Sequence, residues 1–191
     1  IPSKCPVCGS KLVRAREEVA IRCENVGCPA QIKEALLHFA SRNAMDIENM
    51  GDAIANQLVD KGKVKDYSDI YYLKFEDVKA LERMADKSAK NLIDAIQDSK
   101  SRDLNRLIYA LGIRHVGEHA AWLLASHCSS IEKLEHADIE GLTKIEGIGP
   151  VMAESIYIFF QNKENLTISC RKIMFFPFLA VATGLPTTTT H

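Results

Sequence analysis

The sequence has no excess of charge of either sign. Its 191 residues include 24 lysines and arginines and 25 aspartates and glutamates, which gives a net charge of −1. This balance excludes a protein that attracts nucleic acid through bulk basic charge, because such proteins carry a clear surplus of cations. Any contact with nucleic acid would have to depend on local groups.

The sequence also lacks long hydrophobic runs and strong composition bias. Its longest apolar run, "IMFFPFLAVATGL" near the C-terminus, is too short to span a bilayer and is interrupted by Pro177. Apolar residues make up 47% of the chain and charged residues 26%, as in globular proteins. Because the sequence starts at Ile1 and shows no signal peptide, we expect an excised piece of a longer protein.

What the sequence does have is a cluster of cysteines near its start. Four of the six form a C-x2-C pair and a C-x4-C pair separated by fourteen residues: Cys5, Cys8, Cys23 and Cys28. Two disulfides or four buried thiols are the alternatives to a metal site. About thirty residues bury too little surface to fold alone, however, so we predict a structural zinc site with all four positions filled.

The segment between the two cysteine pairs predicts two short strands with a charged turn at residues 16–18. Cys128 and Cys170 have no paired cysteine nearby, and we interpret them as ordinary half-buried thiols.

A second pattern repeats four times. Each copy has an apolar residue, a G-h-G motif (h, hydrophobic) or a degraded form of it, and then an alanine. The alanines lie 34, 32 and 32 residues apart, at Ala55, Ala89, Ala121 and Ala153. The two glycine positions hold Asn49/Gly51, Arg83/Ala85, His115/Gly117 and Gly147/Gly149. Helical periodicity flanks each motif, so each copy predicts a helix, a tight hairpin and a second helix.

The glycines of these hairpins favour a binding role. They permit a positive φ and keep side chains off the outer surface of the turn, while the apolar residue between them, such as Ile148, anchors the loop in the core. The following helix then presents amides and its positive dipole end outward, which suits a phosphate. A purely architectural helix–helix turn is the alternative, and we favour it for the second copy, where Arg83 and Ala85 replace both glycines.

With both features placed, the chain resembles the zinc-finger and helix–hairpin–helix part of the NAD-dependent DNA ligases of bacteria. The resemblance is carried by "CPVCGSKLVR", "RCENVGCPAQ", "HFASRNAMDIENMG", "ALGIRHVGEHAA" and "IEGIGPVMAESIYIFF", and it ends at about Leu166. The predicted fold is mainly α: a zinc finger at 1–30, a connecting helix at 31–46, a helix–hairpin–helix domain at 47–166 and a tail of uncertain origin at 167–191. We expect "HFASRNAMD" to be a helix that closes at a connector.

The resemblance implies a function and partners. It implies the DNA-binding portion of an enzyme that uses NAD and magnesium to seal nicks in duplex DNA during replication and repair, in the bacterial cytoplasm at the nucleoid. It further implies adenylation and oligonucleotide-binding domains upstream in a monomeric parent, and no membrane partner. The family's Lys-x-Asp-Gly adenylation motif does not occur in this sequence, so we expect the chain alone to be inactive.

The expected DNA contacts are the hairpin residues and two neighbouring cations. They are Asn49, Gly51, Lys87, Arg114, His115, Gly117, Gly147, Ile148 and Gly149. We expect the backbone amides to bind phosphates without base specificity. Trp122 and the tyrosines, which lie at helical spacing, are predicted core residues. Two alternatives remain open: a zinc and helix–hairpin–helix module of another repair protein, such as an excision nuclease, and a helical protein-interaction domain.

Overall fold

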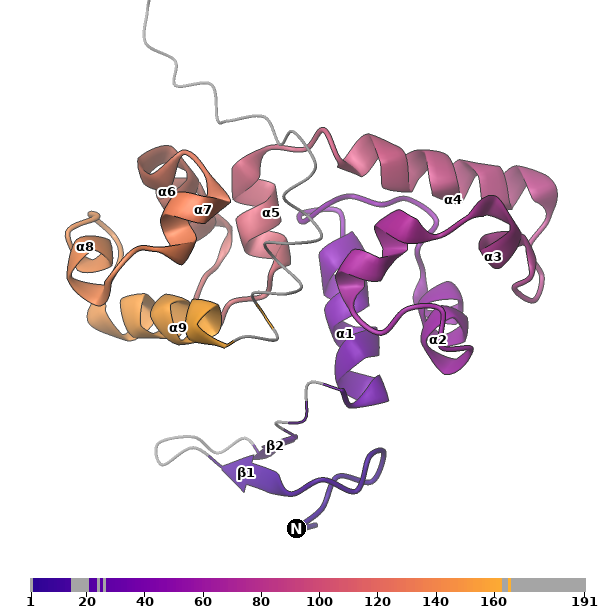
Figure 1. Cartoon of the computed structure of the whole chain (residues 1–191), viewed down its shortest axis with the longest axis horizontal. Coiled ribbons are helices and arrows are strands. Elements are labelled where there is room, and N and C mark those ends of the chain that lie inside the picture. The colour runs from indigo at the N-terminus through magenta and orange to yellow at the C-terminus, as the bar shows by residue number, and fades with distance from the viewer. Residues whose placement is uncertain (1, 15–20, 24, 26, 163–164, 166–191) are drawn as a thin grey trace, which may run out of the picture. The chain divides into compact units, whose positions relative to one another are not determined.

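The computed structural model describes residues 2–14, 21–23, 25, 27–162 and 165 (Figure 1). The predicted turn at residues 16–18, Cys170 and the tail at 167–191 lie outside these residues. By its contacts the chain divides into two compact units: unit 1 comprises residues 1–42 and 46–97, and unit 2 comprises residues 43–45 and those from 98 onward. The domain boundaries expected from the sequence remain predictions.

Unit 1 begins with the cysteine-rich module. Strands β1 (Leu12–Arg14) and β2 (Ile21–Cys23) pair antiparallel, with Leu12 opposite Cys23. Helix α1 (Pro29–Ala40) starts directly after Cys28, and its Pro29 suits a first helical position, where no intrahelical N–H partner is needed. The expected connecting helix therefore starts two residues earlier than its predicted bound and ends at Ala40, and turns occupy residues 41–45.

The rest of unit 1 is helical. It consists of α2 (Asp52–Asp60), the 3-10 helix η1 (Tyr67–Tyr72), α3 (Phe75–Lys79) and α4 (Asp86–Ser99). Phe39 of α1 stacks on Tyr67 with ring centroids 4.8 Å apart and meets Tyr71 edge-on at 6.1 Å. All three rings are buried, so this aromatic cluster forms part of the core of unit 1.

Unit 2 contains α5 (Leu104–Ala110), α6 (Glu118–Cys128), α7 (Ile131–Glu135), α8 (Ile139–Thr143) and α9 (Pro150–Gln161). Helix α5 packs on α6, and α8 packs on α9 (Figure 1). Within the described residues, no helix combines the length and the hydrophobicity that crossing a bilayer requires. The predicted architecture, a four-cysteine module followed by four helix–hairpin–helix units, is confirmed.

The prediction that Trp122 is a core residue is wrong, since its side chain is 47% exposed. The segment "AAWLLA" in α6 is apolar all round, so hydrophobicity alone does not identify the inner face. Packing selects Ala121, Leu124 and Ala125 for the core, and Trp122 falls on the outside. The same prediction holds for Tyr67 and Tyr71 but is wrong for Tyr72, which is 58% exposed.

Candidate metal centre and nucleic-acid interface

The four predicted zinc ligands converge. Their sulfur atoms all lie within 4.8 Å of one another, with 3.9 Å between the Sγ atoms of Cys5 and Cys28 and 3.5 Å between those of Cys8 and Cys23. A tetrahedral zinc thiolate site with Zn–S bonds of about 2.3 Å has sulfurs about 3.8 Å apart. The sulfur positions therefore fit one zinc ion, and with four thiolates no coordination position is left for water.

The loops that carry the cysteines are shaped around this centre. The N–H of Cys5 donates to the carbonyl of Ser10 (2.8 Å), and the N–H of Gly9 donates to the carbonyl of Cys5 (2.9 Å). Gly9 has a φ of +72°, which a glycine adopts without strain. The Asn25 amide donates to the Ser10 hydroxyl (3.2 Å) and so joins the two cysteine loops. Each loop thus holds its pair of sulfurs in a fixed position.

The thiols also show why the cluster needs a cation. Hydrogen bonds from the side chain and the backbone of Ser10 lower the pKa of Cys8 to about 6. At Cys23 a backbone hydrogen bond at Asn25 lowers the pKa, but desolvation and the neighbouring sulfurs of Cys8 and Cys5 outweigh it and raise the pKa to about 12. The neighbouring sulfurs thus oppose ionisation of Cys23, and a divalent cation removes that conflict by stabilising the thiolates that bind it.

The four hairpins share one backbone geometry, although their sequences differ. At the first glycine position φ is positive in every copy: +68° at Asn49, +59° at Arg83, +65° at His115 and +90° at Gly147. The residue two positions before it is buried each time: Ile47, Leu81, Ile113 and Ile145. The sequence repeat is therefore a structural repeat, and it persists in the second copy without either glycine.

The anchoring alanine has the same role in each copy. Its N–H donates to the carbonyl of the second glycine position at 2.9 to 3.0 Å, and its side chain is fully buried: Ala55, Ala89, Ala121 and Ala153. The apolar residue between the glycine positions is buried at Met50, Val116 and Ile148, but only half-buried at Met84. The second hairpin is thus the least anchored of the four.

Hairpins contact their neighbours through equivalent positions. In unit 1, Gln57 of α2 accepts a hydrogen bond from the N–H of Glu82 in the second hairpin (2.7 Å). In unit 2, Leu123 of α6 lies against the fourth hairpin, where a Cβ built on Gly147 would be 2.7 Å from its Cδ1 atom. Gln57 and Leu123 both lie six residues after the second glycine position, so each unit pairs its two hairpins in the same way.

Three helices that follow hairpins begin at a glycine. Gly51, Gly117 and Gly149 are the N-cap residues of α2, α6 and α9, and apart from the glycine and its two chain neighbours no atom of the described residues lies within 4 Å of a Cβ built on any of them. Because glycine has no side chain, the first amides of these helices receive no cap from that position. These helix ends therefore face open space with donors available to an external acceptor.

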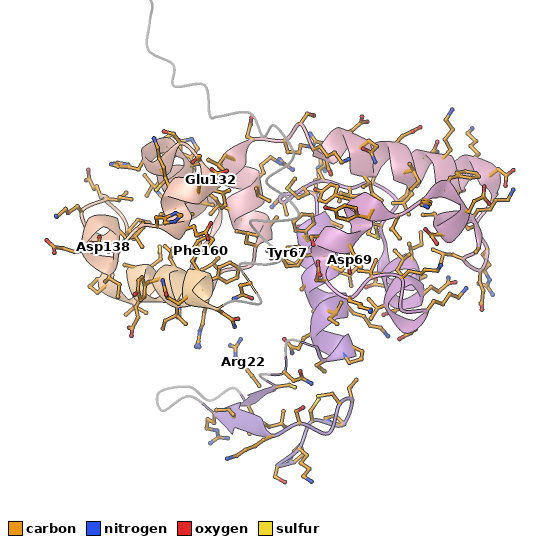
Figure 2. The ribbon with its side chains drawn as sticks, viewed as in Figure 1. Arg22, Tyr67, Asp69, Glu132, Asp138 and Phe160 are labelled. Atoms are coloured by element: carbon orange, nitrogen blue, oxygen red, sulfur yellow. The ribbon has the colours of Figure 1, made fainter. Side chains whose placement is uncertain are left out.

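Three helices that do not directly follow a hairpin begin differently, with a side-chain cap. Asp138 (Figure 2) is the N-cap residue of α8 and its carboxylate accepts the N–H of Gly141 (2.7 Å), while the hydroxyl of Ser130 accepts the N–H of Lys133 in α7 (3.3 Å). Asp66 caps η1 by accepting from the N–H of Ser68 (2.9 Å). Side-chain capping is thus present at η1, α7 and α8, none of which follows a hairpin directly, whereas the three glycine-capped helices are left open.

Charge differs between the four hairpins. The residue before the first glycine position is acidic in three copies, at Glu48, Glu82 and Glu146, and is Arg114 in the third; all four are exposed. The first helical residue is acidic in three copies, at Asp52, Asp86 and Glu118, and is Pro150 in the fourth. Carboxylates repel phosphate, so the third and fourth hairpins have the more favourable electrostatics.

The predicted contact residues occupy corresponding places. Asn49, His115 and Gly147 hold the left-handed position, Gly51, Gly117 and Gly149 hold the N-cap position, and Lys87 and Arg114 are exposed beside their hairpins. Ile148 is instead 4% exposed, so its side chain anchors the loop and only its backbone remains for binding. The amide of Asn43 also donates to the carboxylate of Glu118 (2.8 Å), a contact that no local pattern predicts, since 75 residues separate the two side chains.

The comparisons with known proteins agree with this geometry. The family described as the NAD-dependent DNA ligase C4 zinc finger domain matches residues 4–30. A SAM-like helix–hairpin–helix tandem matches residues 41–98, and a helix–hairpin–helix motif matches residues 106–168. The matches thus cover the cysteine module and both pairs of hairpins.

Curated relatives named DNA ligase match along the chain. The protein of Geotalea uraniireducens (strain Rf4) is 54% identical over 168 residues, which is 88% of this chain and 25% of the relative. That of Pelotomaculum thermopropionicum is 53% identical over 165 residues, 86% of this chain and 24% of the relative. That of Carboxydothermus hydrogenoformans is 52% identical over 168 residues, 88% of this chain and 25% of the relative. The chain spans about a quarter of the length of these relatives, and in sequence, module order and fold it belongs to the NAD-dependent DNA ligase family as its zinc-finger and helix–hairpin–helix part.

Proposed function

We propose that this chain is the part of an NAD-dependent DNA ligase that grips duplex DNA around a nick. The observation that carries the proposal is the set of open, glycine-capped helix ends at Gly51, Gly117 and Gly149. Amides at such ends bind phosphate oxygens through hydrogen bonds and the helix dipole. Because phosphates carry no sequence information, the expected binding is independent of base sequence.

The hairpins do not contribute equally to this proposed interface. The third and fourth hairpins provide the main phosphate contacts, since both have glycine caps and fewer acidic neighbours than the first. Lys87 and Arg114 supply cations beside the second and third hairpins. Arg83 retains the left-handed backbone without the open glycine cap, so the second hairpin is chiefly architectural.

A structural zinc ion held by the four cysteines completes the proposed fragment. It fixes the end of β2 and the start of α1, because Cys23 ends the strand and Cys28 caps the helix. NAD and magnesium belong to the chemistry of the parent enzyme and would act at its adenylation domain. We expect a monomeric parent in the cytoplasm, close to the nucleoid, with adenylation and oligonucleotide-binding domains as intramolecular partners.

Two measurements test this function. Fluorescence anisotropy at low salt should show binding to a nicked duplex and to unrelated duplex sequences with similar affinity, at or below about 10 µM. Lack of binding at tens of micromolar, roughly the range of ordinary non-specific association, would remove the phosphate-binding role.

Nick sealing tests the link to ligation. The chain is added to, or fused with, an N-terminal ligase portion that carries the adenylation lysine, and sealing of a labelled nick is followed. We expect no sealing by this chain alone and restored sealing by the combination. A double variant, Gly117→Val with Gly149→Val, should restore sealing poorly. Equal sealing with and without the chain would contradict the proposal.

A further inference from the structure

The one tryptophan of the sequence is exposed on the outer face of α6. Trp122 is 47% exposed, and its ring stacks on that of His119 with centroids 6.2 Å apart and planes inclined by 14°. A large aromatic side chain contributes more when it is buried in a core or an interface than when it lies in water. The core of unit 2 does not use this ring, so its position requires another explanation.

The position itself faces outward throughout the repeat. Trp122 lies five residues after the second glycine position of its copy. The residues at the same place in the other copies are Asn56, Lys90 and Glu154, and all three are exposed. His119 likewise corresponds to the exposed residues Ala53, Lys87 and Val151. The third copy therefore places the two stacked rings of His119 and Trp122 on the outward face of the first turns of α6, directly after its hairpin.

The surroundings of this pair favour nucleic acid over a protein partner. Beyond Trp122, the accessible residues of α6 include the polar Ser126 and His127, and the half-buried Leu123 lies against Gly147 of the fourth hairpin, so α6 itself adds no broad apolar patch around the ring. The adjoining hairpin carries Arg114 and His115, and the carboxylate of Glu118 already accepts the amide of Asn43 at 2.8 Å. A flat ring next to a hairpin that carries the Arg114 guanidinium and open amides suits a sugar edge next to a phosphate.

We propose that the Trp122–His119 pair is an additional duplex contact, in which the indole lies against a deoxyribose and the adjoining base edge next to the phosphate bound at the third hairpin. This inference rests on the proposed DNA-binding function. The contact is apolar and adds to the affinity without reading base identity. It gives the third hairpin a contact that the other three copies lack, because their equivalent side chains are an amide, an ammonium and a carboxylate.

Intrinsic fluorescence tests the contact directly, because Trp122 is the chain's one tryptophan. The full chain is titrated with nicked duplex while indole emission and the anisotropy of labelled DNA are recorded in parallel. We expect free protein to emit as an exposed indole and DNA to quench or shift that emission with the same midpoint as the anisotropy. Trp122→Ala should bind about tenfold more weakly, and Trp122→Phe should recover most of the loss. Asn56→Ala, at the equivalent outward position of the first copy, is the matched control and should bind as the wild type does.

The outcomes separate the two proposals. Normal anisotropy with unchanged emission and a Trp122→Ala variant of wild-type affinity would overturn the indole contact and leave the hairpin proposal standing. Loss of all binding in the wild-type chain would overturn both. Emission typical of a buried indole in the absence of DNA would also overturn the inference. If that emission changes with protein concentration, a second copy of the chain covers the ring. If it is independent of concentration, another part of the same chain covers the ring. Circular dichroism melts of each variant exclude loss of folding as the cause.

Discussion

At the scale of single residues, the hairpins separate two roles that glycine can have. Gly147 has a φ of +90° and lies against Leu123, so both its conformation and its surroundings exclude a side chain. Gly149 has a φ of −81° and open space around its Cβ position, so neither its backbone conformation nor its surroundings exclude a side chain. The sequence identifies the pair as a motif but cannot tell these roles apart, because the distinction depends on a contact with α6.

The two glycines therefore predict opposite phenotypes. Gly149→Val should leave the fold intact and weaken duplex binding by about tenfold to a hundredfold, since one charge-assisted contact contributes about 1.5–3 kcal/mol. The loss should be similar for unrelated DNA sequences. Gly147→Val should instead lower the melting temperature, because it combines left-handed strain with overpacking of about 1–3 kcal/mol.

Thermal melts and anisotropy on the same samples check both variants. Ala85→Val provides a matched control for Gly149→Val, because it changes the same position in a hairpin that already has a Cβ. We expect little loss of affinity from it. A folded Gly149→Val protein that binds DNA as the wild type does would contradict an approach of phosphate to that helix end.

The left-handed position shows how far the sequence could be read at this scale. Asn49 adopts a positive φ, which asparagine tolerates better than most residues other than glycine. Arg83 and His115 were degraded glycine positions in the sequence, yet they adopt the same backbone. The repeat is therefore imposed by the buried residues around the turn, such as Leu81 and Ala89, which outweigh the local preference of the residue that turns.

At the scale of elements, α7, α8 and η1 begin at side-chain caps. Asp138→Ala removes the acceptor of the Gly141 N–H and should cost about 1 kcal/mol of stability, or a fall of a few degrees in melting temperature. DNA binding should be unchanged, because this cap lies at the N-terminal end of α8, whereas the fourth hairpin follows the C-terminal end of that helix. Calorimetry together with anisotropy checks both statements.

Asp103 provides the control for this substitution. It is also an N-cap aspartate, of α5, but its side chain makes no capping hydrogen bond. Asp103→Ala should therefore lower the melting temperature less than Asp138→Ala. Equal losses would show that the cost comes from general charge effects at a helix N-terminus and not from the Asp138 hydrogen bond.

The cysteine module is the element most dependent on a ligand. One zinc ion per chain is expected, and Cys23→Ser should reduce the zinc content and unfold the module locally while the helical circular dichroism signal is retained. Cys128→Ser is the matched control, since burial raises the pKa of that thiol and it lies outside the cluster. Less than half an equivalent of zinc in the wild type would contradict the structural-zinc prediction.

The pH dependence of this module has a defined sign. Zinc binds thiolates, so binding releases protons and apparent affinity should fall as pH decreases. The raised pKa of Cys23, about 12 without metal, means that zinc must displace a tightly held proton there at neutral pH. Zinc retention measured between about pH 5 and pH 8 should therefore fall toward the acidic end.

At the scale of the whole molecule, the order of the modules agrees between the sequence predictions and the structure, but some exposed residues and long-range contacts were not predicted. The zinc module, the four hairpins and the mainly helical fold follow from cysteine spacing and from a repeat of about 32 residues. The exposed ring of Trp122 could not be predicted, because it depends on which face of a uniformly apolar helix packs inward. The Asn43–Glu118 hydrogen bond could not be predicted either, because the two residues are 75 positions apart in sequence. Periodicity reports local geometry, whereas those features are set by tertiary packing.

The net charge of −1 leads to a prediction for the molecule as a whole. Binding that depends on backbone amides at a few hairpins involves few neutralised phosphates, so the salt dependence of the affinity should be shallow. With about two to four phosphate contacts, a plot of log affinity against log salt should have a slope of about −2 to −4. Arg114→Ala should reduce its magnitude by about one, because it removes a cation beside the third hairpin, whereas Lys65→Ala, outside every hairpin, should leave it unchanged. Titrations at several potassium chloride concentrations measure this slope, and a value near −8 would show that distributed lysines and arginines carry the interaction in place of the hairpin amides.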